Sequence, residues 1–158
     1  SVPGAASLTV RGLNSSGQVA GSYYDVGEVP HAFTWLNGVA LDLGTLGGSS
    51  SEAFAINAFG QVAGSADTVG DAALHAYLGI GRTLTDLGTL GGANSVASSV
   101  SDAGHVVGSS EFSAGVDFHA FLQLNGGVMV DLGTLGGSSS SAMYTIPHPP
   151  SPIFCSNL

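Results

Sequence analysis

The chain has 158 residues, of which 44% are hydrophobic and only 8% are charged, so it can bury a core and is not disordered as a whole. Asp and Glu outnumber Lys and Arg by 11 to 2, which gives a formal net charge of -9. Two scattered arginines cannot form the basic cluster that nucleic acid or an anionic membrane surface requires, so neither is expected as a partner. No apolar stretch reaches the about 18 residues of a membrane span, so membrane insertion is not expected either.

Three short signatures recur in register along the chain. Asp-Leu-Gly-Thr-Leu-Gly-Gly occupies 42–48, 86–92 and 131–137, at spacings of 44 and 45 residues. His-Ala-aromatic begins at His31, His75 and His119, and Gly-Gln-Val-Ala-Gly occupies 17–21 and 60–64, with a variant at 104–108. Such repetition at a fixed period indicates a tandem array of structural units.

Each unit is predicted to contain four short strands joined by glycine-rich turns. Glycines recur too often for a helix, in which each would cost about 1 kcal/mol, so the fold class is all-β. The tight turns between neighbouring strands make the pairing antiparallel. In the second unit the predicted strands are 53–57, 61–66, 75–80 and 84–90, with turns at 58–60 and 81–82 and a polar loop at 67–73.

The repeat domain is predicted to cover 1–145. Its units span about 7–48, 49–92 and 93–137, and a fourth unit starts at 138–145. The rest of the chain, 146–158, shares nothing with the repeat and contains four of the six prolines between 147 and 152. Proline cannot donate to a sheet ladder, so this tail is interpreted as foreign to the repeat.

A four-stranded antiparallel unit of about 45 residues has the size of one β-propeller blade. The strand order also resembles that of WD40 blades. The fold is therefore predicted to be a β-propeller fragment of three four-stranded blades, with a β-solenoid as the second architecture.

The paired His-Ala-Phe and Asp-Leu-Gly-Thr-Leu-Gly-Gly motifs resemble the HAF family of extracellular repeats. The resemblance covers about 7–145. It implies a secreted or surface-exposed repeat protein, and it implies no defined biochemical activity. Localisation is accordingly expected to be extracellular or at the cell surface.

Three blades are too few to close a propeller ring, which usually has four to eight. An open arc would leave the apolar faces of two terminal blades in water. Two copies would form a six-bladed closed ring, and two-fold dimers are the commonest oligomers. The chain is therefore expected to bind itself as a homodimer.

The histidines are the first candidate site residues, because they start the third strand of every unit. They could act as a ring of ligands or bases, but a residue repeated in every unit usually serves the fold, so a structural role is preferred. WD40 blades contain a comparable network of histidine, serine or threonine, aspartate and tryptophan, so the resemblance implies an aspartate of the same unit as the partner of each histidine. The threonines of the heptapeptide are expected in β positions. The residues concerned are His31, His75 and His119, with Asp42, Asp86 and Asp131, and with Thr45, Thr89 and Thr134.

The loops between the second and third strands are the second candidate, because they differ between units and each carries two acids around a glycine. Their oxygen atoms are the ligand type that Ca²⁺ prefers, and they could also contact another ligand. No loop matches a calcium-binding motif, so no metal or other cofactor is expected and calcium remains an alternative. The candidate ligand-binding residues are Asp25, Glu28, Asp67, Asp71, Glu111 and Asp117.

The function expected from these features is an extracellular binding or interaction scaffold whose ligand is unknown. A carbohydrate or another protein is a possible partner. The alternative is a hydrolase acting on esters, because a WD40-like arrangement brings the acidic loops and the Gly-Gly-Ser connections to one face, with Ser, His and acid together there or at a subunit seam. The sequence contains no Gly-x-Ser-x-Gly elbow.

Overall fold

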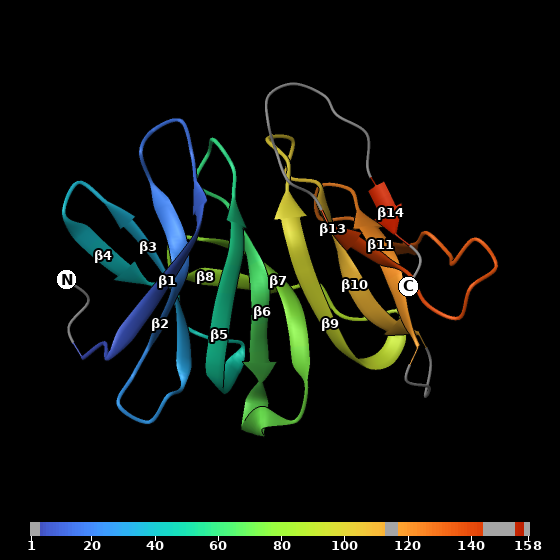
Figure 1. Cartoon of the computed structure of the whole chain (residues 1–158), viewed down its shortest axis with the longest axis horizontal. Helices are drawn as coiled ribbons and strands as arrows, with labels where there is room; N and C mark the ends of the chain where they lie inside the picture. Colours follow the sequence, from blue (N-terminus) through green and yellow to red (C-terminus); the bar gives the residue numbers. More distant parts are fainter. Residues whose placement is uncertain (1–3, 113–116, 144–153, 157–158) are drawn as a thin grey trace.

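A computed structural model describes 4–112, 117–143 and 154–156 of the chain. These residues form an all-β structure of three four-stranded antiparallel sheets, A, B and C, and a two-stranded sheet, D. In each four-stranded sheet the strands follow one another in chain order, so every repeat unit forms one sheet (Figure 1). No helix in the described part of the chain is long and apolar enough to cross a membrane.

The strand boundaries follow the repeat closely. Sheet A contains β1 (Ser7–Leu13), β2 (Val19–Tyr24), β3 (Pro30–Leu36) and β4 (Val39–Asp42). Sheet B contains β5 (Gly47–Ile56), β6 (Val62–Thr68), β7 (Leu74–Ile80) and β8 (Thr83–Asp86), with a 3-10 turn at Val69–Asp71. Sheet C contains β9 (Gly91–Val100), β10 (Val106–Phe112), β11 (Phe118–Gln123) and β12 (Met129–Asp131), and sheet D pairs β13 (Ser141–Met143) with β14 (Phe154–Ser156).

The heptapeptide connects one sheet to the next, and its structure differs from the prediction. The fourth strand of sheet B ends at Asp86 instead of continuing to 90, and β9 begins at Gly91. Thr89 lies between these strands, where its hydroxyl donates to Gly92 O at 2.8 Å and accepts from Gly91 N at 3.2 Å. The prediction that these threonines fill β positions is wrong, because Thr45, Thr89 and Thr134 all lie outside the strands. The side chains of Thr45 and Thr89 cap the Gly-Gly turn instead.

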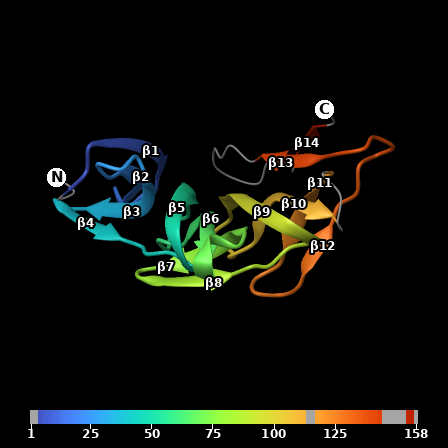
Figure 2. The same cartoon turned by 90° about the horizontal axis from the view of Figure 1, so that it is seen from below.

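The three sheets lie next to one another in chain order and bury their cores between facing surfaces (Figure 2). We call the surface of a sheet that faces the preceding sheet its leading face and the opposite surface its trailing face. Between sheets A and B, the trailing face of A contributes Ala20, Ala32 and Leu43, and the leading face of B contributes Ala53, Ile56, Val62, Ala66 and Tyr77. Between B and C, the trailing face of B contributes Ala63, Ala76 and Leu87, and the leading face of C contributes Ala97, Val100, Val106 and Phe121.

Glycine in the second strand of each sheet permits close contact with the first strand. A Cβ atom added at Gly21, Gly64 or Gly108 would lie 2.0 Å from the carbonyl oxygen of Thr9, Glu52 or Val96, respectively. The pairing register shifts close to this point in all three sheets, which marks a β-bulge. The glycine of this signature, which reads Val-Ala-Gly in two units and Val-Val-Gly in the third, is therefore required by backbone packing within each sheet.

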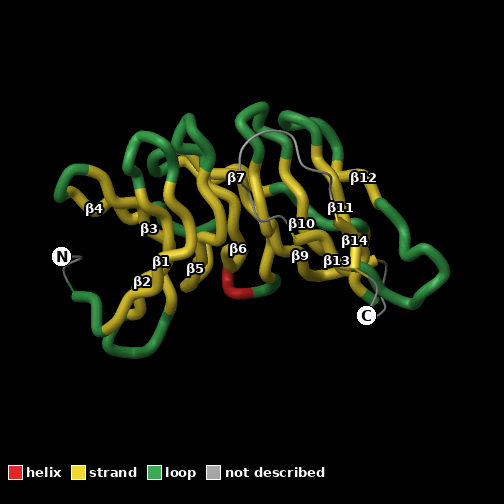
Figure 3. The backbone as a smooth tube through the Cα atoms, turned by 45° about the horizontal axis from the view of Figure 1, so that its top comes forward, coloured by secondary structure: helices red, strands yellow, loops and turns green. Residues whose placement is uncertain are grey.

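The turns between the first and second strands are also connected from sheet to sheet. The Asn14 side-chain amide donates to Asn57 O at 3.0 Å, and that of Asn57 donates to Ser101 O at 2.9 Å. Each asparagine also closes its own turn, since Asn57 Oδ1 accepts from Phe59 N and Gln61 N. Figure 3 shows the loops in relation to the strands of the three sheets.

Candidate functional site

Histidine and aspartate form a pair in the second and third sheets. His75 Nδ1 lies 2.9 Å from both carboxylate oxygens of Asp86, and His119 Nδ1 lies 2.9 Å from Asp131 Oδ2. The strand register brings them together, because Asp86 pairs with Tyr77 and Asp131 with Phe121, two residues after each histidine. The predicted partnership is therefore confirmed in sheets B and C.

Sheet A does not form this pair, so the prediction is wrong for Asp42. Tyr23 donates its hydroxyl to Asp42 Oδ2 at 2.6 Å, and burial together with this carboxylate raises the pKa of Tyr23 to about 12. His31 stacks on the Tyr23 ring, with centroids 5.1 Å apart, and its Nε2 lies 3.6 Å from Asp25 Oδ2. Sheets B and C have Ala66 and Ser110 at the position of Tyr23, and both leave room for the histidine.

Each aspartate of the heptapeptide also closes the turn that follows it. The carboxylates of Asp42, Asp86 and Asp131 accept the N–H of the glycine two residues later at 2.7 to 2.8 Å. Burial would raise the pKa of Asp131, but the hydrogen bonds from His119 and from Gly133 N–H outweigh it and hold that pKa below its usual range. The charged carboxylate is thus the form that the fold stabilises.

Buried serines from the next unit bind the strand that carries each histidine. Ser51, Ser95 and Ser140 accept the backbone N–H of Ala32, Ala76 and Ala120 at 2.8 to 2.9 Å. The Ser95 and Ser140 hydroxyls also donate to Gly88 O and Gly133 O at 2.6 Å. These serines connect adjacent units through the His-Ala-aromatic strand.

The structure brings histidines and aspartates together but does not add a serine to them. Among the described residues, no serine hydroxyl makes a hydrogen bond to the ring of His31, His75 or His119. A nucleophilic serine requires a base within hydrogen-bond reach. The inter-sheet serines instead bond to backbone groups, as given above.

Three of the acidic residues of the second candidate site bind backbone or side-chain groups in the region that follows the Gly-Gly turn. Asp71 accepts from Ser49 N at 2.7 Å, and Asp67 accepts from the Ser50 hydroxyl at 2.5 Å. Glu111 accepts from Ala93 N and from the amide and side chain of Asn94, and these hydrogen bonds, that of the Asn94 side chain first, hold the pKa of Glu111 below its usual range. The predicted proximity of acidic loops and Gly-Gly connections is confirmed at these positions.

The other three acidic residues of this candidate site take no part in the contacts just described. Asp25 closes its own loop by accepting from Val29 N and Gly27 N, which lowers its pKa together with the nearby His31. Glu28 has a left-handed backbone with φ of 63°, and Asp117 is exposed. In the described part of the chain no three His, Cys, Asp or Glu residues are grouped so as to hold a metal ion.

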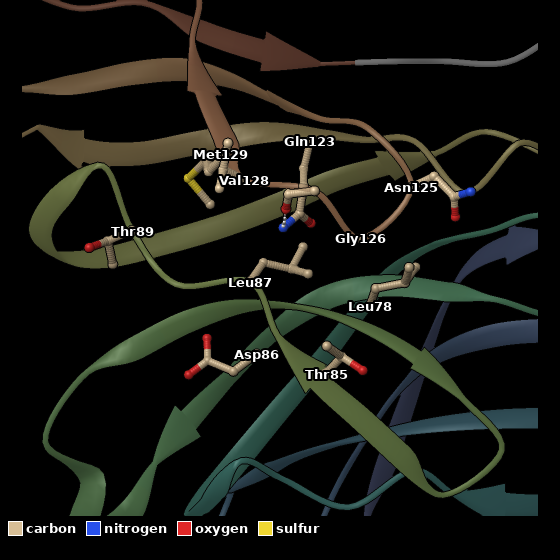
Figure 4. Close-up of a pocket in the computed structure, with 11 residues that line it drawn as sticks. Leu78, Thr85, Asp86, Leu87, Thr89, Gln123, Asn125, Gly126, Val128 and Met129 are labelled. Carbon is tan, nitrogen blue, oxygen red and sulfur yellow. Dashed lines mark hydrogen bonds between the residues drawn. The ribbon is translucent and has the colours of Figure 1, made fainter.

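A groove of about 600 Å³ lies between sheets B and C (Figure 4). Sheet B contributes Leu78, Thr85 and Leu87, and sheet C contributes Gln123, Met129 and the turn between β11 and β12. Gln123 is fixed by donating its side-chain amide to Gly127 O at 2.7 Å. Asp86 is the charged residue of the lining, and its carboxylate is already bound by His75.

The full lining is Leu78, Thr85, Asp86, Leu87, Thr89, Gln123, Asn125, Gly126, Gly127, Val128 and Met129. Sequence reasoning missed this groove because its two walls come from different units. The sequence did contain a signal for the groove, because Gln123 occupies the position at which the other units have Trp35 and Gly79. A departure from an otherwise regular repeat is where a specific surface is expected.

Comparisons of the chain with protein-family models, with curated proteins and with solved structures find no match in any of the three.

Proposed function

We propose that the chain is an extracellular binding scaffold of the β-propeller type and that its ligand occupies the groove between sheets B and C. The observation that supports this proposal is that the repeated polar residues already form hydrogen bonds within the fold. His75 bonds to Asp86 within sheet B at 2.9 Å, and Ser95 of the next unit accepts from Ala76 N at 2.8 Å and donates to Gly88 O at 2.6 Å. The recurring polar residues therefore serve the fold, and we assign the ligand to the groove, whose lining combines Leu87 and Thr89 of the recurring heptapeptide with Gln123 and Met129, which do not recur in the other units.

The lining favours an uncharged ligand that carries hydroxyl groups. It contains no Lys or Arg, and the net charge of -9 disfavours anions. Thr85, Gln123 and Asn125 provide hydroxyl and amide groups, and Leu78, Leu87 and Met129 provide apolar contact. A neutral oligosaccharide has this combination of hydroxyl and C–H surfaces.

Nuclear magnetic resonance titration of the full chain with cellotetraose and with maltotetraose tests the proposal. We expect shifts of the amide signals of Thr85, Gln123 and Gly126, and loss of those shifts in Thr85→Lys. Thr83→Lys is the matched control, because Thr83 is exposed on the same strand outside the groove lining. Shifts that are absent, or that persist unchanged in Thr85→Lys, would contradict binding in this groove.

The second candidate function is an esterase, which the two His–Asp pairs favour because an aspartate can orient a histidine base. Hydrolysis of 4-nitrophenyl acetate that disappears in His75→Ala or His119→Ala, with the fold intact, would replace the binding scaffold with this activity. We expect no such loss, since no described serine bonds to either ring.

We propose further that two copies of the chain complete a closed six-sheet propeller. Sheets A, B and C stack in one direction, and the first strand of a fourth unit continues the series by binding Ala120 N–H through Ser140. A closed ring removes the open ends of such a stack, which in repeat proteins otherwise require polar caps.

A further inference from the structure

Apolar side chains occupy, between sheets A and B, the position of the repeat that is a groove between sheets B and C. Leu41 of β4 and Leu84 of β8 pack against the core between A and B. Gly79 has no side chain there, and a Cβ atom added to it would lie 2.6 Å from Leu84 Cδ2. Leu84 therefore takes the space that a side chain at this position would need, and the first junction is apolar at this point.

The second junction has different residues at the same positions of the repeat. The strand register places Thr85 where sheet A has Leu41, and Gln123 where sheet B has Gly79. Met129 pairs with Gln123, and all three side chains line the groove (Figure 4). Two polar side chains thus replace a leucine and a glycine at the point where sheets B and C leave a cavity.

The third unit is one residue longer than the second, and the added residue lies in the turn between β11 and β12. Five residues separate the paired Gln123 and Met129, whereas four separate the paired Gly79 and Leu84 in sheet B. The carbonyl oxygen of Gly127 in this longer turn accepts the side-chain amide of Gln123 at 2.7 Å. The added residue therefore belongs to the turn that fixes Gln123.

The hydrogen bond to Gly127 leaves the other end of the Gln123 amide available. A carbonyl oxygen can only accept, so the amide nitrogen of Gln123 must face Gly127 and its Oε1 must point away. Gln123 is 6% exposed, yet no described residue donates a hydrogen bond to Oε1, and this atom is not cut off from solvent. The groove thus contains a fixed hydrogen-bond acceptor on an almost fully buried side chain.

We propose that Gln123 determines the specificity of the groove by accepting a hydrogen bond through Oε1 from a hydroxyl group of the ligand. This inference rests on the ligand site proposed above and specifies what that site selects. The nitrogen of Gln123 is engaged with Gly127, so the groove can pair a donor at this point but not a group that only accepts. A carbohydrate with free hydroxyl groups is therefore bound in preference to the same carbohydrate with methylated hydroxyl groups.

Apolar neighbours make this hydrogen bond selective. Leu87 lies on the wall of sheet B and Met129 lies beside Gln123 in sheet C (Figure 4). A ligand that fills the groove removes Oε1 from water, and an acceptor that is buried without a donor costs the full desolvation of that atom. A site built to bind a hydroxyl group rejects an analogue that lacks it for the same reason.

Isothermal titration calorimetry of the full chain with cellotetraose and with maltotetraose, each free and fully O-methylated, tests the selection. We expect the wild type to bind the free form of its saccharide at least about tenfold more tightly than the methylated form. Gln123→Met keeps an unbranched side chain but removes the acceptor, so we expect it to bind the free form about tenfold more weakly and to lose most of the preference. Gln18→Met is the matched control, because Gln18 lies outside the groove lining, and it should keep the preference of the wild type.

The outcomes separate this inference from the ligand site on which it rests. A wild type that binds none of the saccharides would overturn both. A saccharide that binds the wild type and a folded Gln123→Met with the same preference for its free form would overturn the role of Gln123 alone. Equal affinity of the wild type for the free and methylated forms would do the same.

The side-chain amide signal of Gln123 provides a test that needs no folded variant. The chain has three glutamines, Gln18, Gln61 and Gln123, so their amide signals can be told apart by nuclear magnetic resonance of the wild type. A hydrogen bond to Oε1 polarises the amide, so we expect the Gln123 signal to move on adding the free saccharide and the signals of the other two to stay. A Gln123 signal that does not move when the saccharide binds would contradict the inference.

Discussion

The third strand of each unit carries the same histidine as its second residue, but the three histidines have different surroundings. His119 is held by Asp131 at 2.9 Å and stacks on Phe112 with ring centroids 4.6 Å apart, whereas His31 lies 3.6 Å from Asp25. The repeated residue is therefore not equally important in each sheet. Its contribution depends on which residue of the second strand lies beside it.

His119→Ala should lower the free energy of unfolding by about 1 to 3 kcal/mol, because it removes a hydrogen bond to a partly buried carboxylate and an aromatic contact. His31→Ala should cost less, since its contact is longer and Asp25 keeps its bonds to Val29 N and Gly27 N. Urea unfolding of the two variants measures the difference. Equal costs would contradict the assigned roles.

Asp131 makes stability depend on pH. Its native pKa lies below its usual range, so its contribution is fully present above the ordinary carboxyl pKa of about 4 and is lost as pH falls through the lower native value. Asp131→Asn should therefore be less stable than the wild type near pH 7. The difference in stability between the two proteins should become smaller as the pH falls below 4. Melting temperatures of both proteins across this range test the sign.

Calcium should have little effect on stability. Asp67, Asp71 and Glu111 already accept hydrogen bonds from the chain, which leaves fewer oxygen atoms for a cation. A ligand that binds only the native state must raise the melting temperature. A clear rise in melting temperature on adding calcium to chelator-treated protein would contradict this prediction and support the metal-binding alternative.

At the scale of the strands and turns, the asparagine of the first turn joins one sheet to the next. Asn57 is buried, closes its own turn and donates to Ser101 O of sheet C. Asn57→Ala should cost about 2 to 4 kcal/mol, because it removes several partly buried hydrogen bonds, among them those to Ser101 O, Phe59 N and Gln61 N. Asn14→Ala should cost less, since Asn14 belongs to the outer sheet and its side chain is more exposed.

Thermal unfolding of the two asparagine variants, each normalised to the wild type, checks the order. A larger loss in Asn14→Ala would contradict the role assigned to the inter-sheet bond.

The repeat predicted the sheets better than it predicted their connections. Glycine and strand alternation were enough to predict the third strand at 75–80, which the structure has at Leu74–Ile80. The fourth strand was predicted too long, because 87–90 looks apolar and β-like although Asp86 and Thr89 fold it into a turn. The aspartate partners of His75 and His119 were expected from the repeat together with the resemblance to WD40 blades, whereas the hydrogen bond from Tyr23 to Asp42 depends on a contact across two strands that the repeat does not predict.

At the scale of the whole molecule, the two ends of the stack differ from its middle. The leading face of sheet A has larger apolar residues than the faces buried inside, and the trailing face of sheet C is covered by a strand of three residues. The groove that we propose for the ligand lies away from both ends, between sheets B and C. Ligand binding and chain association can therefore be tested separately.

Small-angle X-ray scattering of the full chain at micromolar concentrations tests the central claim most directly. A closed ring of two chains predicts a particle of about twice the 15.6 kDa chain mass, with a flat disc shape, whose dissociation on dilution lowers the melting temperature. A folded, monodisperse particle of 15.6 kDa at the same concentrations would contradict ring closure and would leave the three sheets as an open stack.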